Sequence, residues 1–115
     1  MSIGERLITL EEYEAFLDEN PDGLYELLDG RIVEKLPTQE HGHIVLRVGG
    51  RLQLFVEDRG LGRAYTEARY RPEDSTQNDR MPDISYVANP NAPVTRQGAA
   101  PGMPDFVVEV QSPRD

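Results

Sequence analysis

The segment from Phe106 to Gln111 constrains the fold most, because it is a short apolar run with one acid inside it. The run reads FVVEV, and Glu109 interrupts the valines. An apolar run of this length is typical of a strand that is covered on both faces of a sheet. We therefore expect this strand to be central in an α/β sandwich. Glu109 would then need a partner, because a buried unpaired carboxylate is strongly destabilising.

Composition narrows the class of protein. The 115 residues suffice for one domain with a modest core, so residues 1–115 are expected to form a single domain. The absence of a signal peptide or membrane-spanning segment predicts a cytoplasmic protein. Cysteine is absent, which excludes disulfides and thiolate metal sites. The net charge of −9 argues against simple binding to nucleic-acid phosphates, but a carboxylate metal site would itself be acidic.

Two helices are expected. The first begins after Thr9, which forms a capping-box pattern with Glu12. The second runs from residue 39 to residue 58, where Gly49 and Gly50 are expected to permit close packing against a sheet. Its apolar stripe, at helical period, consists of Ile44, Val48, Leu52, Phe55 and Val56.

The strands are expected around one clear turn. Asp29-Gly30 is the strongest local signal for a two-residue hairpin. That turn places Leu24 opposite Lys35, and it puts Glu26 and Lys35 on the same face as diagonal neighbours. The remaining strands are expected at residues 63–70, 82–87 and 106–111, in a sheet with the long helix packed on one face.

Four acids lie in these strand-like surroundings: Glu26, Asp83, Asp105 and Glu109. Asp105 and Glu109 share one face but stand about 13 Å apart along a strand, too far to share one ion. If the strand of Asp83 lies beside that of Glu109, the two carboxylates could meet and bind a divalent cation. A cation would relieve their mutual repulsion. Magnesium held by two carboxylates, waters and phosphate oxygens is an arrangement that hydrolyses phosphodiesters.

Several segments, in this order, resemble one known family. They are YELLDGRIVE, the following helix with His41-Gly42-His43, RMPDISYV and PDFVVEVQSP. Together they resemble the Uma-type putative restriction endonuclease family of the PD-(D/E)XK nuclease superfamily, over residues 10–113. The resemblance implies a restriction-endonuclease-like core, with a central mixed sheet flanked by helices, and hydrolysis of DNA that depends on Mg²⁺ or Mn²⁺. It implies that Asp83 and Glu109 bind the metal and that the hairpin contributes Glu26 as a further acid.

The chain also departs from the superfamily pattern, which places a lysine two residues after the second acid. Gln111 stands there and is expected to orient the attacking water or a phosphate oxygen. The resemblance puts a lysine on the next helix, beyond residue 115. Ser112-Pro113 looks like the start of that helix, so we expect the chain to end partway through its domain and to be inactive or barely active. Restriction-type cutting of two strands makes a homodimer the expected assembly.

Other interpretations stay open. Glu109 could be a structural carboxylate paired with an arginine such as Arg69 or Arg80. A hairpin glutamate such as Glu26 ordinarily faces water. The only lysine, Lys35, could reach the site from the hairpin, but a solvated strand residue is the expectation. His41 could position a phosphate or cap the long helix, and the cap is the expectation. The missing motif lysine and the negative charge favour a second function class, a catalytically inactive nuclease-like domain that binds DNA or a protein.

Overall fold

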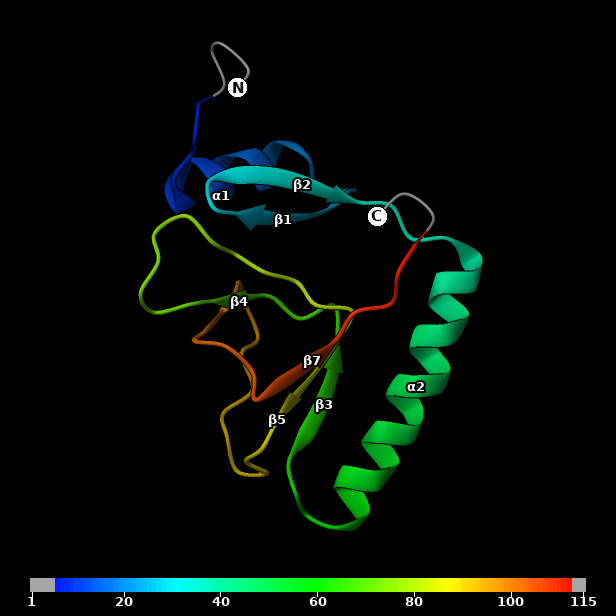
Figure 1. Cartoon of the computed structure of the whole chain (residues 1–115). Helices are drawn as coiled ribbons and strands as arrows, with labels where there is room; N and C mark the ends of the chain where they lie inside the picture. Colours follow the sequence, from blue (N-terminus) through cyan, green and yellow to red (C-terminus); the bar gives the residue numbers. More distant parts are fainter. Residues whose placement is uncertain (1–5, 113–115) are drawn as a thin grey trace.

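A computed structural model describes residues 6–112 of the chain (Figure 1). The chain begins with helix α1 (Leu10–Glu19), followed by a hairpin of β1 (Leu24–Leu28) and β2 (Arg31–Lys35). The long helix α2 (Gln39–Asp58) comes next. Short strands complete the described chain: β3 (Arg63–Thr66), β4 (Tyr70–Arg71), β5 (Ile84–Val87), β6 (Ala100–Pro101) and β7 (Phe106–Val108). The chain thus combines helices and sheets in one fold, which confirms the predicted mixture of helices and strands.

The hairpin has the predicted register. Asp29 and Gly30 both have positive φ, 49° and 80°, as a two-residue turn of type I′ requires. Leu24 pairs with Lys35 in the antiparallel ladder. The side chains of Glu26 and Lys35 therefore belong to the same face of the hairpin.

Asp79 ties α1 and the hairpin to the rest of the molecule. Its backbone exchanges two hydrogen bonds with Leu27 of β1, at 2.8 and 2.9 Å. Its carboxylate, 1% exposed, accepts hydrogen bonds from Arg69 and Arg71. Both arginines also donate to Glu14 of α1. This network fixes where the hairpin, and with it Glu26 and Lys35, stands relative to the main sheet.

The main sheet has the order β3-β5-β7, with both pairs antiparallel. The central strand is β5, in which Ile84 and Ser85 are at most 1% exposed. The prediction that the strand at Phe106 is central is wrong, because β7 lies at an edge of the described sheet with Phe106 and Val107 more than 40% exposed. An apolar run of three residues does not tell a strand covered on both faces from an edge strand.

Helix α2 runs alongside this sheet (Figure 1) and packs on it through buried residues of which only Val56 belongs to the predicted stripe. These residues are Val45, Gly49 and Val56, whereas Ile44, Val48 and Phe55 are 39–50% exposed. Apolar residues lie on more than one side of this helix, and contact with the sheet selects the side that is buried. Of the two glycines expected to permit close packing, Gly49 faces the sheet, where a Cβ would lie 3.6 Å from Thr66. The prediction for Gly50 is wrong, because a Cβ there would meet no atom within 4 Å.

Two further expectations concern membrane-spanning segments and a helix start near the end of the chain. In the part of the chain that the structure describes, no helix is both long and apolar enough to cross a membrane. The helix start expected at Ser112-Pro113 falls on a boundary: Ser112 is buried, and Pro113 lies outside the described residues.

Candidate functional site

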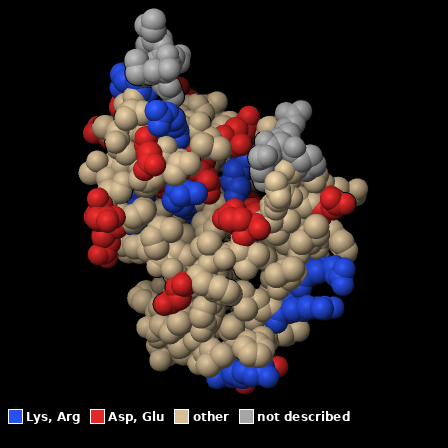
Figure 2. All heavy atoms as spheres, viewed as in Figure 1, with Lys and Arg blue, Asp and Glu red and all other residues tan. Residues whose placement is uncertain are grey.

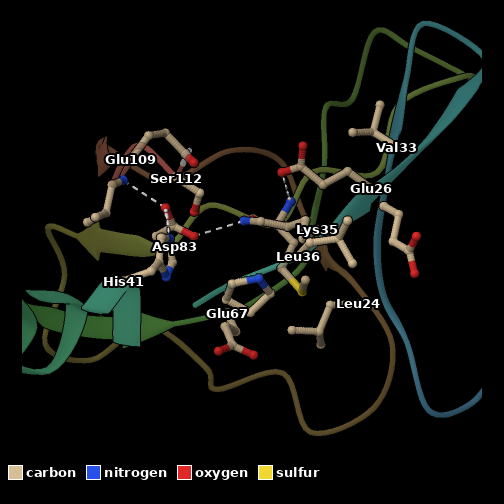
Figure 3. Close-up of a pocket in the computed structure, with 14 residues that line it drawn as sticks. Leu24, Glu26, Val33, Lys35, Leu36, His41, Glu67, Asp83, Glu109 and Ser112 are labelled. Carbon is tan, nitrogen blue, oxygen red and sulfur yellow. Dashed lines mark hydrogen bonds and ion pairs between the residues drawn. The ribbon is translucent and has the colours of Figure 1, made fainter. Parts of the chain in front are cut away.

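A cavity of about 210 Å³ lies where the hairpin, the start of α2 and the ends of β5 and β7 meet (Figure 3). It brings together three of the four predicted site residues, Glu26, Asp83 and Glu109. The fourth, Gln111, is exposed and is not among the residues that line the cavity. The acids therefore converge as predicted, although they come from three separate strands or strand ends.

Asp83 and Glu109 lie next to the ends of two neighbouring strands. Ile84 of β5 pairs with Val108 of β7, and Asp83 and Glu109 are the adjoining residues in the chain and both line the cavity. The backbone N–H of Val110 donates to Oδ2 of Asp83 at 2.7 Å. Asp83 is buried, with 4% of its surface exposed, so this hydrogen bond fixes its carboxylate in one orientation. Glu109 is exposed, which corrects the expectation of a buried acid between valines.

Lys35 reaches the site from the end of β2. Its Nζ donates to Oδ1 of Asp83 at 3.0 Å and to the carbonyl oxygen of Met81 at 2.5 Å. The side chain is only 17% exposed. The expectation of a solvated strand lysine is therefore wrong. The reason is tertiary, because docking of the hairpin carries this face of β2 onto the start of β5.

His41 also contacts Asp83. Its Nε2 lies 3.1 Å from Oδ2 of Asp83, and its side chain is 10% exposed. The cap of α2 is Thr38, whose Oγ1 accepts a hydrogen bond from the backbone N–H of His41 at 3.1 Å. The prediction that His41 caps the helix is wrong, because Thr38 already satisfies that part of the helix N-terminus and frees the imidazole to face the cavity.

Burial, hydrogen bonds and nearby charges shift the pKa values of Asp83 and Glu109 in opposite directions. Burial alone would raise the pKa of Asp83, but the hydrogen bonds from Val110, Lys35 and His41 and the charge of Lys35 outweigh it and hold that pKa below its ordinary value. The pKa of Glu109 is raised, first because neighbouring atoms remove part of its hydration, and further by the negative charges of Asp83 and Glu26. Lys35 opposes that rise. Asp83 is thus held ionised, while Glu109 takes up a proton more readily than an ordinary glutamate.

Glu26 is buried, with 8% of its surface exposed, so the expectation that it faces water is wrong. Its Oε1 accepts a hydrogen bond from the backbone N–H of Met81 at 2.9 Å, and Arg80 lies 3.6 Å from Oε2. Arg69, the other arginine considered for Glu109, is bound to Asp79 and Glu14. The ion pairs found among the described residues therefore give Glu109 no arginine partner.

The metal-ligand atoms in the cavity suit a cation that keeps much of its water better than a cation surrounded entirely by protein ligands. Among the described residues, no group of three or more His, Cys, Asp or Glu side chains is arranged to hold a metal ion. Asp83 and Glu109 offer two carboxylates, which is the number that Mg²⁺ commonly takes from a protein, with water and phosphate oxygens in its other positions. Among the described residues, Oδ1 of Asp83 accepts one hydrogen bond, from Lys35, so it keeps acceptor capacity for a cation.

Comparison with known proteins supports the sequence resemblance. A family described as Uma2, putative restriction endonuclease, matches residues 10–115. The chain belongs to the Uma2 family. Among solved structures, this Uma2 chain is similar to one described as a putative nuclease belonging to DUF820 from Anabaena variabilis ATCC 29413, with 25% identity and a TM-score of 0.72. The match covers 94% of this chain and 60% of that chain. No match is found among curated proteins.

Sequence reasoning about this Uma2 chain considered Lys35 and His41 at the site but favoured other places for them, and it missed Glu67. The signal for Lys35 was present, since the predicted register already placed it on the face of Glu26. Glu67 lines the cavity with a φ of 53°, a backbone conformation uncommon for a residue other than glycine, and no local pattern indicated it.

Proposed function

We propose that this Uma2 domain is an endonuclease that hydrolyses DNA phosphodiester bonds with Mg²⁺ or Mn²⁺ held by Asp83 and Glu109. The observation that carries the proposal is that these two carboxylates, each next to the paired residues Ile84 and Val108, line one cavity. Family membership supports the class of reaction. The chain spans 60% of the similar solved nuclease, so an activity of a whole protein of that length is itself only proposed.

The chain's own residues prepare the site in distinct ways. When bound, the cation would lower the pKa of a water molecule and offset the negative charge of the phosphate. Asp83 supplies a carboxylate that is ionised and fixed by Val110 and Lys35. Glu26, held by the N–H of Met81, lies at the same cavity and is proposed to act directly or through water. Gln111, which follows β7 in the chain, is proposed to orient water, and this requires its exposed side chain to turn toward the cavity.

Calorimetric titration of the chain with Mn²⁺ tests the metal site. We expect binding that is lost in Asp83→Asn and in Glu109→Gln. Glu73→Gln is a matched control, because Glu73 is exposed and lies outside the lining of the cavity. A chain without measurable affinity for Mn²⁺ would refute the proposal.

Cleavage of supercoiled plasmid tests the reaction, with long incubations because weak activity is expected. Cleavage should require Mn²⁺ or Mg²⁺, stop on chelation, and be absent in Glu109→Gln. Gln111→Ala should keep its affinity for Mn²⁺, and a fall in cleavage of tenfold or more in that variant would support the orienting part of Gln111. Cleavage that persists in Glu109→Gln would show that another group holds the cation.

One observation favours a second function, a catalytically inactive nuclease-like domain that binds DNA or a protein. The carboxylate of Asp83 already has three hydrogen-bond partners, Lys35, His41 and Val110. A carboxylate that is already hydrogen-bonded within the protein in this way can stabilise the fold without binding a metal ion. DNA binding that does not change with Mn²⁺, together with no cleavage, would favour this alternative over the nuclease.

A further inference from the structure

We propose that Arg47 and Arg51, on the exposed side of helix α2, bind backbone phosphates of duplex DNA away from the bond that is cleaved. The inference rests on the proposed function, because DNA is the substrate proposed there. It goes beyond that function by adding a docking surface outside the cavity. Contacts of this kind position a protein on DNA without reading its bases, so the surface should bind duplexes of any sequence.

The first observation is that the two arginines stand one helical turn apart on an exposed side of α2. They are the only Lys or Arg residues of this helix, and both are exposed. Within residues 6–112, neither side chain has a hydrogen bond or an ion pair. Side chains three and four positions away are neighbours on a helix, and none of these is acidic: they are His43, Ile44, Val48, Gly50, Leu54 and Phe55. The two guanidinium groups are therefore free to bind a ligand.

The second observation concerns charge. The chain has 21 acidic residues against 12 Lys and Arg, and most basic side chains in its described part contact an acid or a carbonyl oxygen, as Arg69 and Arg80 do. Arg47 and Arg51 differ, since two like charges at this spacing on a helix repel each other. An anion bound between them would offset the repulsion. Arginine binds phosphate oxygens through strong and often bidentate hydrogen bonds, so the pair fits a phosphate better than a neutral ligand.

The third observation is the shape of the surface beside the arginines. Both line an open depression of about 130 Å³, together with Ile44 and Val48. Gly50 stands next to Arg51 and is also exposed, although glycine inside a helix is unfavourable. A Cβ there would meet no atom within 4 Å, so packing among the described residues does not require a glycine. The missing side chain lets the backbone of another molecule approach the helix closely.

The fourth observation is the place of this surface relative to the cavity. Figure 2 shows basic side chains over α2 on the same face of the molecule as the charged side chains between the hairpin and the main sheet. His41, in the first turn of α2, lines the cavity. At a rise of about 1.5 Å per residue, Arg47 and Arg51 lie about 9 Å and about 15 Å farther along the helix axis. Phosphates of one DNA strand follow each other every ~3.4 Å along the duplex axis, so a duplex with one phosphate in the cavity places others within this reach.

Fluorescence anisotropy of a short labelled DNA duplex tests the surface. The titration is done at low salt with Ca²⁺, and gel electrophoresis verifies that the duplex stays intact. We expect Arg47→Gln and Arg51→Gln each to lower the affinity about fivefold, and the double variant about twentyfold or more. Each lost phosphate contact should also reduce the dependence of log affinity on log salt concentration by about 1. Two duplexes of unrelated sequence should show the same losses, because the contacts are made to the backbone.

Matched variants separate a local contact from a general effect of charge. Arg96→Gln removes the same charge from an exposed arginine outside this surface, and it should change the affinity less than twofold with the salt dependence unaltered. Gly50→Leu keeps every charge but fills the space beside the arginines, and it should lower the affinity about fivefold. Thermal melting should show every variant at least as stable as the native chain, because the changed residues are exposed and Gln suits a helix about as well as Arg.

The outcomes distinguish this surface from the proposed function. A double variant that binds the duplex within twofold of the native affinity overturns the inference, even where the native chain cleaves plasmid with Mn²⁺. A native chain that does not bind the duplex at low salt, or an equal loss in Arg96→Gln, overturns it as well. Binding that depends on Arg47 and Arg51 in a chain without metal-dependent cleavage supports the surface and refutes the hydrolytic function.

Discussion

Nζ of Lys35 lies 3.0 Å from Oδ1 of Asp83, although 48 residues separate the two in the chain. This contact joins the β1–β2 hairpin to the start of the central strand β5. It places a positive charge beside the carboxylate that lines the same cavity as Glu109. The hairpin is therefore part of the candidate site, although it forms a two-stranded sheet of its own.

Glu109→Gln should remove Mn²⁺ binding with little effect on stability. Glu109 is exposed, and its raised pKa shows that the surroundings do not favour its charge, so the neutral amide should leave the free energy of unfolding equal or slightly higher, within about 0.5 kcal/mol. Calorimetry and thermal melting measure the two effects, with Glu73→Gln as the control. A strong loss of stability would instead make Glu109 a structural partner.

Asp83 should make stability fall in acid. Because its pKa in the folded chain is lowered below the ordinary 3.8, its ionised form stabilises the fold at higher pH, and this contribution is lost as the pH falls from about 3.8 through the folded pKa. Asp83→Asn should be less stable at pH 7 and should show a shallower decline at acid pH. Urea unfolding between pH 2.5 and pH 7 measures both. Parallel pH profiles for the two proteins would contradict the assignment.

Asp79→Asn should be among the most destabilising changes of a single acid. Its carboxylate is 1% exposed and pairs with Arg69 and Arg71, so its removal leaves two guanidinium groups without their buried partner. A loss of about 3–5 kcal/mol is expected from urea unfolding. Glu14→Gln changes the partly exposed acid of the same network and should cost about 1 kcal/mol or less. Equal losses in the two variants would show that burial of Asp79 is not the cause.

Gly49 and Gly50, which are neighbours inside α2, should respond in opposite ways to larger side chains. A Cβ at Gly50 meets no atom within 4 Å, so Gly50→Ala should stabilise the helix by about 0.5–1 kcal/mol through propensity alone. Gly49 faces Thr66 and Ile84 at 3.6–3.8 Å, so Gly49→Leu should overpack that contact and cost about 1–3 kcal/mol. Thermal melting distinguishes them. Destabilisation by Gly50→Ala would mean that α2 is less regular there than its backbone indicates.

The sequence by itself determined the elements whose signals act over a few residues. Thr9 and Glu12 form the predicted capping box, and α2 has the predicted bounds from Gln39 to Asp58. The Asp29-Gly30 turn fixed the register of the hairpin, because its backbone geometry allows one pairing of the flanking strands. The order of the acidic segments was also enough to indicate the family.

Only the tertiary structure decided which faces are buried and which residues meet. The apolar run at Phe106 carried no information on its neighbours, so its place at the edge beside β5 could not be derived from it. The burial of Lys35 against Asp83 depends on how the hairpin docks through Asp79. That docking is set by contacts between residues far apart in the chain, whose free energy depends on the packing of the whole molecule and leaves no periodic trace in the local sequence.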